Sequence, residues 1–241
     1  MMMSDSTDSR HEEFVNNLRH LNECRRFLDL KFKEINRDEG LDFIPMPKQK
    51  EKNFLQQRTD GTPVKSIECL YQAADKISAK LRQELEAMAE VLGKIINPKN
   101  PCIQQPTIEV KNLKDRIRAD QKATENYMMK IPGPRYAWIY DILRGSVVCN
   151  DPLQIATCVS WLKNHTKIIK AKNRFAEPAF NGYRDLLFHI VIEDKETGFS
   201  HVCELQVNMK CLWHNVNLSS YILMFGVCFS FTGPSSGNAG G

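Results

Sequence analysis

Glu204 and Gln206 stand two residues apart in an alternating stretch, and a carboxylate beside an amide can bind a metal ion or a polar ligand. Successive side chains of a β-strand point to opposite faces, so these two residues share one face with Ser200, Val202 and Asn208. The other face carries Phe199, His201, Cys203, Leu205 and Val207. Burying a carboxylate on a half-apolar face is costly without a cation. A metal or bound ligand removes that cost; contact with solvent or a lysine is the plainer alternative, and patterning alone favours it.

Asp141 is a second carboxylate of interest, because it directly precedes a strand expected at Arg144 to Cys149. Two carboxylates that converge from neighbouring elements suit Mg²⁺, which completes its shell with phosphate oxygens and water. Any α+β domain also supplies such pairs by chance.

Basic residues form the third candidate group, at Lys170 to Arg174 and again in Asn181-Gly182-Tyr183-Arg184. Cations that leave a strand before a glycine-containing turn can hold a polyphosphate, lysine as a point charge and arginine as a fork. Tyr183 could present its ring to a base. A solvated strand end and a core tyrosine at a turn are the alternatives, about equally favoured.

The elements that must position these groups follow from hydrophobic periodicity. Strands are expected at 144–149, 166–172, 185–192 and 199–207, the last two as a hairpin whose turn ends at Gly198. Asp151-Pro152 starts a helix predicted to bury Leu153, Ala156, Val159 and Leu162, and 111–129 is predicted as a charged helix. Such mixing indicates an α+β sheet with helices on it.

Long helices are expected before this region. One begins at a capping box, Ser9 to Glu12, and a second follows Thr62-Pro63, where Thr62 suits the N-cap. Residues 40–61 between them are expected to form a loop or linker. The second helix carries an apolar stripe at Ile67, Tyr71, Ala74, Ile77, Leu81, Leu85, Met88 and Leu92.

These patterns divide the chain into four parts. They are an N-terminal helix and linker (1–61), a long helix that packs on the α+β domain or dimerises with it (62–106), the α+β domain itself (107–218), and an apolar segment with a Gly/Ser tail (219–241). The helical stripes predict a homo-oligomer or packing across the domain.

Composition limits the class of protein. Hydrophobic residues make up 42% and charged residues 26%, and a net charge of +4 permits an anionic ligand without indicating nucleic acid. Eight scattered cysteines without a CxxC pair favour reduced, mostly buried thiols in a cytoplasmic protein. No signal peptide is recognised, and the apolar run 221–231 is too short to span a membrane, which takes about 20 residues.

The order of these pieces resembles the synthetase domain of RelA/SpoT proteins. Lys111, the run from Asp141 to Arg144, Lys172, Asn181-Gly182-Tyr183 and Glu204-Leu205-Gln206 follow the family order between about 108 and 208. The resemblance implies a nucleotidyltransferase-like, mixed five-stranded sheet flanked by helices.

It also implies an activity: transfer of the β,γ-pyrophosphate of ATP to the 3′-hydroxyl of GDP or GTP, with Mg²⁺ as cofactor, in guanosine tetraphosphate metabolism. By position, Asp141 and Glu204 resemble the catalytic and metal-binding carboxylates, Tyr183 the residue that stacks on guanine, and Lys111 the lysine of the ATP motif. The nucleotide-binding set that the resemblance implies is Lys111, Lys114, Arg144, Lys172, Arg174, Asn181, Tyr183, Arg184 and Gln206.

The sequence departs from the family pattern at three places. Ala179 stands where the family has a phosphate-binding lysine, Glu109 where it has the arginine of the ATP motif, and 207–209 differ from the usual Ile-Arg-Thr. Arg174, Arg184 and Lys114 could substitute. Two alternatives to the synthetase therefore stay open: a catalytically degenerate module that binds nucleotide or a partner, and pyrophosphate transfer to an RNA 3′ end.

Overall fold

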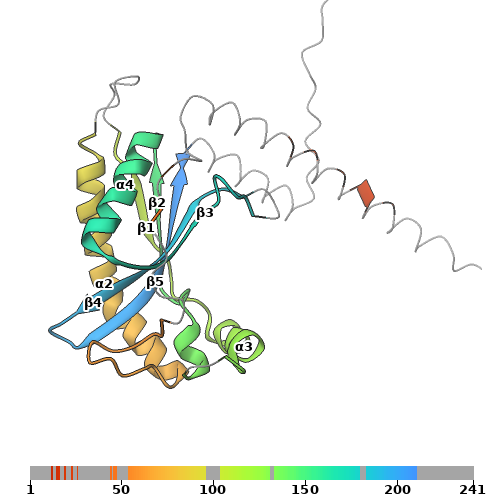
Figure 1. Cartoon of the computed structure of the whole chain (residues 1–241), viewed down its shortest axis with the longest axis vertical. Helices are drawn as coiled ribbons and strands as arrows, with labels where there is room; N and C mark the ends of the chain where they lie inside the picture. Colours follow the sequence, from red (N-terminus) through yellow and green to blue (C-terminus); the bar gives the residue numbers. More distant parts are fainter. Residues whose placement is uncertain are drawn as a thin grey trace, which may run out of the picture.

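The computed structural model describes residues 54–95, 104–130, 133–179 and 183–210, with isolated positions before residue 54. Its centre is one five-stranded sheet (Figure 1). The strands are β1 (Thr107–Val110), β2 (Arg144–Cys149), β3 (Lys167–Asn173), β4 (Leu186–Asp194) and β5 (Phe199–Met209). They are ordered β1-β2-β5-β4-β3. Only β2 and β5 run parallel; the other neighbours are antiparallel, so the predicted mixed five-stranded α+β sheet is confirmed.

Two helices pack on one face of this sheet. They are α2 (Ile67–Leu92) and α4 (Pro152–His165), seen together on the left of Figure 1. The predicted stripe of α2 is buried from Tyr71 to Leu92, and it belongs to the same apolar core as Cys203, Leu205 and Val207 of β5. Burying an apolar stripe against a sheet is what stabilises a helix of this kind in water.

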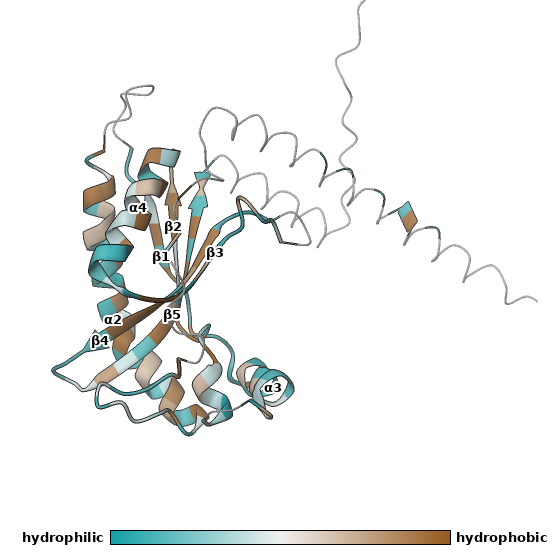
Figure 2. Ribbon diagram, viewed as in Figure 1, coloured by the Kyte–Doolittle hydropathy of each residue, from teal (hydrophilic) through white to brown (hydrophobic). Residues whose placement is uncertain are grey.

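Helix α3 (Arg116–Tyr127) lies at one end of the sheet and is largely hydrophilic (Figure 2). Asp115 caps it by accepting a hydrogen bond from the backbone N of Arg118 (3.0 Å). Only Ala119 and Ala123 of this helix are buried. A helix with so narrow an apolar face leaves most of its charged side chains at the surface, beside the end of the sheet.

Three local predictions were wrong. The helix predicted from residue 111 starts only at Arg116, and the short strand β1 just before residue 111 was not predicted. Helix α2 is capped by Ser66, not Thr62, because the backbone N of Thr62 donates to Asp60 Oδ1 in a turn instead. In α4, Leu153 and Ala156 face solvent, while Ile155, Cys158, Val159, Trp161 and Leu162 are buried.

Other local predictions were confirmed. Asp151 caps α4, accepting from the backbone N of Gln154 (3.0 Å), and Pro152 occupies the first turn. Strands β4 and β5 form the expected hairpin, whose turn ends at Gly198 with φ of +73°. Such a backbone angle favours glycine, since it lacks the Cβ that would clash.

Gln56 completes β5 beyond the end of β2. Among the described strands, β2 reaches only as far as Glu204, so one edge of Val202 lacks a strand partner. The Gln56 side chain takes that place: Nε2 donates to Val202 O (3.0 Å) and Oε1 accepts from Val202 N (2.7 Å). Nε2 also donates to Ile139 O (2.9 Å). The fully buried side chain therefore joins residues 54–64 to β5 and to the loop before β2.

Some predictions fall on residues outside the described ranges. These are most of the N-terminal helix, the Asn181-Gly182 pair and the apolar run 221–231. Within the described part of the chain, no helix is both long enough and apolar enough to cross a membrane.

Candidate functional site

The structure confirms the predicted sorting of β5 side chains. Cys203, Leu205 and Val207 enter the core beneath the helices, whereas Val202 packs on the other side in a small cluster with Phe54, Ile169 and Val191. Glu204 and Gln206 share the face of Val202. Neither α2 nor α4 covers this surface, which is called here the open face.

A row of polar side chains crosses the open face at the level of Glu204. Arg144 of β2 and His189 of β4 are its two register neighbours, and the backbone of Lys111 continues the row by donating from N to Arg144 O (2.9 Å). His189 Nε2 lies 3.7 Å from Glu204 Oε2, and its ring meets that of Tyr140 edge-on with centroids 5.1 Å apart. The Glu204 carboxylate is thus flanked by one permanent cation and one imidazole.

Asp141 sits between two lysines at the end of this face. Lys114, after β1, and Lys122, on α3, both donate from Nζ to Asp141 Oδ2, at 2.7 and 2.8 Å. Burial alone would raise the pKa of Asp141, but the hydrogen bonds and charges of the two lysines outweigh it and hold this pKa below its ordinary value. Oδ1 is buried and has no hydrogen-bond partner among the described residues. One oxygen of Asp141 is therefore neutralised internally while the other remains a candidate ligand atom.

A second group surrounds a cavity of about 640 Å³ at the end of β3. Lys172 and Arg174 line it, together with residues of the loop that follows β3. Arg174 Nη1 donates to both carboxylate oxygens of Asp185, at 3.1 and 3.3 Å. Asp185 is fully buried; burial raises its pKa to about 6 despite the opposing charge of Arg174.

Tyr183 and Arg184 make contacts that bear on their predicted roles. Tyr183 Oη donates to Asn208 Oδ1 (3.0 Å), and the Arg174 guanidinium lies 5.9 Å from the centroid of its ring. Burial raises the pKa of the Tyr183 phenol, so the hydroxyl stays protonated. Arg184 Nη1 donates to Phe175 O (2.7 Å), which ties the guanidinium to the loop after β3.

Gln206 lies one pleat from Glu204, between Ser146 of β2 and Leu187 of β4. In the same row, Ser146 Oγ donates to Glu109 Oε2 (3.4 Å), so Glu109 places a negative charge on this side of the sheet. Asn181 lies outside the described residues.

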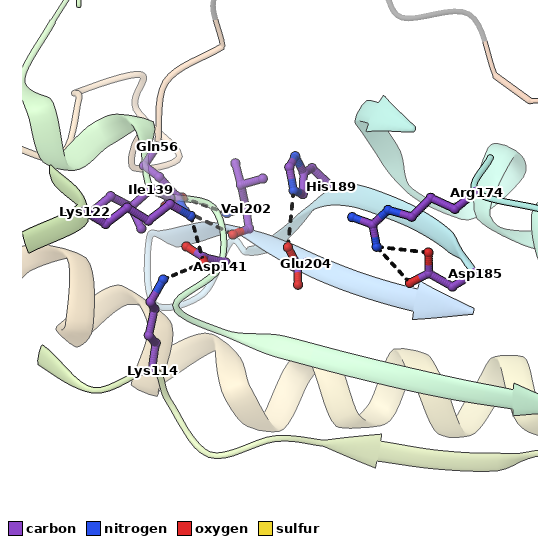
Figure 3. A network of polar contacts seen from close by, with 10 residues as sticks. All are labelled: Gln56, Lys114, Lys122, Ile139, Asp141, Arg174, Asp185, His189, Val202 and Glu204. Atoms are coloured by element: carbon purple, nitrogen blue, oxygen red, sulfur yellow. Dashed lines mark hydrogen bonds and ion pairs between the residues drawn. The ribbon is translucent and has the colours of Figure 1, made fainter. Parts of the chain in front are cut away.

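Figure 3 shows how the two groups are related. From left to right it shows Asp141 with its two lysines, Glu204 with His189, and the Arg174–Asp185 pair. The structure therefore brings Asp141, Lys114, Arg144, Glu204, Gln206, Lys172, Arg174 and Tyr183 to the open face or its two ends. Arg184 is instead engaged with the loop backbone.

The donor set fits Mg²⁺ in part. The described residues contain no cluster of three or more His, Cys, Asp and Glu side chains suited to a metal. Mg²⁺ needs only one or two carboxylates when phosphate oxygens and water complete its shell. The unpartnered Oδ1 of Asp141 and the carboxylate of Glu204 are the atoms that could hold it with a bound polyphosphate.

Sequence reasoning missed three residues of this arrangement. Lys122 was not predicted because its ion pair with Asp141 depends on where α3 packs relative to that carboxylate. His189 was assigned to the correct face of β4 but not connected to Glu204, its register partner. Asp185 follows Arg184 in the sequence, and a carboxylate at the start of an apolar strand was a signal that could have been used.

Neither a family model nor a curated protein matches the chain. Among solved structures, it is similar to small alarmone synthetase 1 of Bacillus subtilis bound to its product pppGpp, with 14% identity and a TM-score of 0.46, covering 65% of this chain and 80% of that one. The chain is also similar to small alarmone synthetase 2 of Bacillus subtilis, with 19% identity and a TM-score of 0.43, covering 64% of this chain and 81% of that one. A GTP pyrophosphokinase family protein of Streptococcus pneumoniae is similar with 13% identity and a TM-score of 0.43, covering 65% of this chain and 76% of that one. These similarities concern the path of the chain and assign no role to any residue.

Proposed function

We propose that the protein is a pyrophosphotransferase that moves the β,γ-pyrophosphate of ATP to the 3′-hydroxyl of GDP or GTP. The observation that carries the proposal is the open face itself. It sets two carboxylates, Asp141 and Glu204, among cations from several different elements. The sequence motifs that contribute these residues also follow the order found in the RelA/SpoT synthetase domain, which the sequence resembles.

The residues divide into two roles. Lys172 and Arg174 at the cavity, and Arg144 beside Glu204, supply positive charge for two polyphosphates. Phosphoryl chemistry depends on such positioning and charge compensation more than on covalent groups of the protein. Bound Mg²⁺, held by Asp141 Oδ1 and Glu204, would supply charge neutralisation on the phosphates.

The transfer forms one bond to phosphorus and breaks another. The 3′-hydroxyl oxygen of the acceptor forms a bond to the β-phosphorus of ATP, and the bond from that phosphorus to the α–β bridging oxygen breaks. AMP leaves with that bridging oxygen. Glu204 accepts the hydroxyl proton, because it is the carboxylate in the middle of the open face and its neighbours are a cation and an imidazole.

The test is a transfer assay with [γ-³²P]ATP, Mg²⁺ and GDP, GTP or tRNA, resolved by thin-layer chromatography. Glu204→Gln and Asp141→Asn are expected to lower the rate by about 10²- to 10⁴-fold, since each removes a charge that acts on the reacting groups. Glu193→Gln and Asp75→Asn remove exposed carboxylates of the same types and are the matched controls. A chelator should stop transfer, and added Mg²⁺ should restore it.

Product with RNA alone would move the proposal to a different acceptor. Full activity of Glu204→Gln would refute the assignment of the base, and an absence of product with every acceptor would refute the enzymatic function.

A second candidate is a non-catalytic module that binds nucleotide. Two observations favour it: Asp141 is already neutralised by Lys114 and Lys122, and Glu109 adds negative charge on the same side of the sheet. This candidate predicts that GDP or ATP raises the Tm of the protein while no transfer occurs. An unchanged Tm with every nucleotide would reject it.

A further inference from the structure

The loop after β3 and the start of β4 meet beside the cavity that Arg174 lines. Arg174 and Asp185 help to join them: the backbone N of Arg174 donates to Asp185 O (2.9 Å), and the Arg174 guanidinium donates to the Asp185 carboxylate. Both carboxylate contacts use Nη1. Figure 3 shows the pair at the far end of the open face from Asp141.

Asp185 is poorly suited to stabilise the fold. Its side chain is fully buried, whereas that of Arg174 is 24% exposed and reaches the cavity. Burying a carboxylate is costly, and the raised pKa of Asp185 reflects that its contacts with Arg174 and Tyr183 offset only part of this cost. Two other titratable groups act on this pKa: a hydrogen bond with the Tyr183 side chain lowers it, and the charge of Glu204 raises it. A residue kept at such a cost is expected to serve the guanidinium that it holds.

We propose that Asp185 is a positioning residue that fixes the Arg174 guanidinium at the cavity, ready to bind the phosphates of a nucleotide. A free arginine side chain loses much rotamer freedom when it binds an anion. A guanidinium already held by a buried carboxylate has lost that freedom before the ligand arrives, so affinity rises. The choice of a nucleotide phosphate as ligand rests on the proposed function.

Positioning and simple electrostatics predict opposite signs. Asp185 is an anion beside an anion-binding cavity, so removing its charge should tighten phosphate binding if charge alone matters. If it holds Arg174, Asp185→Asn should weaken binding on the order of tenfold, within the range for coupled neighbours. Glu177→Gln removes a carboxylate from the lining of the same cavity and is the matched control, expected to bind no more weakly than wild type.

The experiment measures GDP and inorganic pyrophosphate binding by calorimetry for the full chain and for Asp185→Asn, Arg174→Ala and the double variant. Positioning predicts that Asp185→Asn weakens binding in the wild-type background and changes nothing once Arg174 is alanine. Arg174→Lys, which keeps the charge but loses the fork, should also weaken binding. Tm is recorded for each variant, so a loss of fold is seen directly.

Equal weakening by Asp185→Asn in both backgrounds, or tighter binding, would overturn the proposal. So would a wild-type protein that binds neither probe. A protein that binds GDP with the predicted coupling but transfers no pyrophosphate would refute the proposed activity and leave the role of Asp185 standing.

Discussion

Removing the Gln56 side chain should show how much the buried hydrogen bonds between distant segments contribute to the stability of the fold. It is fully buried and makes three hydrogen bonds to backbone groups, two of them to Val202 and one to Ile139. Gln56→Ala would leave the Val202 N–H and two carbonyls buried without these partners. The helices and the strand pairing of the sheet would keep their own contacts.

The expected loss of stability follows from the number of hydrogen bonds that the Gln56 side chain makes. A hydrogen bond contributes about 1 kcal/mol net, and an unsatisfied buried partner costs at least as much, so Gln56→Ala should lower the free energy of unfolding by about 3 kcal/mol. In a chain of this length each kcal/mol shifts Tm by about 2–4 °C, so Tm should fall by about 9 °C.

The assay is urea unfolding followed by circular dichroism and tryptophan fluorescence, with Gln57→Ala as the control. Gln57 is the neighbouring residue and is only half-buried, and its structural contact is through backbone O, which accepts from Ser200 Oγ and is kept in the variant. A difference below about 1 kcal/mol between the two variants would refute the reasoning, because the buried bonds would then contribute no more than an ordinary surface change.

Two further predictions concern the core and the acid sensitivity of the fold. Leu85→Ala should lower the free energy of unfolding by about 2–5 kcal/mol in urea titrations, because Leu85 is buried between α2 and the sheet, whereas the exposed Leu153→Ala should change it by about 0.5 kcal/mol or less. His201 is buried and burial lowers its pKa to about 3 from 6.5, so the unfolded chain takes up the proton first and stability falls as pH drops below 6.5. By pH 5 the free energy of unfolding should have fallen by about 2 kcal/mol for this reason, and His201→Gln should not show this part of the loss. If the two proteins lose the same stability between pH 6.5 and pH 5, burial of His201 is not the cause. Asp185, whose pKa is raised, acts with the opposite sign in this window and is common to both proteins.

Local patterns in the sequence were sufficient for several parts of the fold. Alternation placed β2 at 144–149 and sorted Glu204 and Gln206 to the face away from the core. Asp151-Pro152 marked the start of α4, and the stripe of α2 marked the face that the helix buries. These features depend on residues near one another in the chain, where side-chain periodicity and capping chemistry act.

The failures have one physical cause, which is that a short pattern fits more than one structure. Strand β1 was not predicted, because four residues are too few for alternation to identify a strand, and it is defined by pairing with β2. Leu153 is apolar but exposed, because the orientation of α4 is set by Ile155, Cys158 and Leu162 packing on the sheet and α2.

The candidate site shows the same division. The sequence by itself determined which residue types could do chemistry: the carboxylates Asp141 and Glu204, and the cations near Lys172. Only the tertiary structure decided their neighbours, since Lys122 reaches Asp141 from α3 and Glu204 lies beside Arg144 because β5 inserts between β2 and β4. Pairing between distant segments is set by how the whole core packs, and no local spacing encodes it.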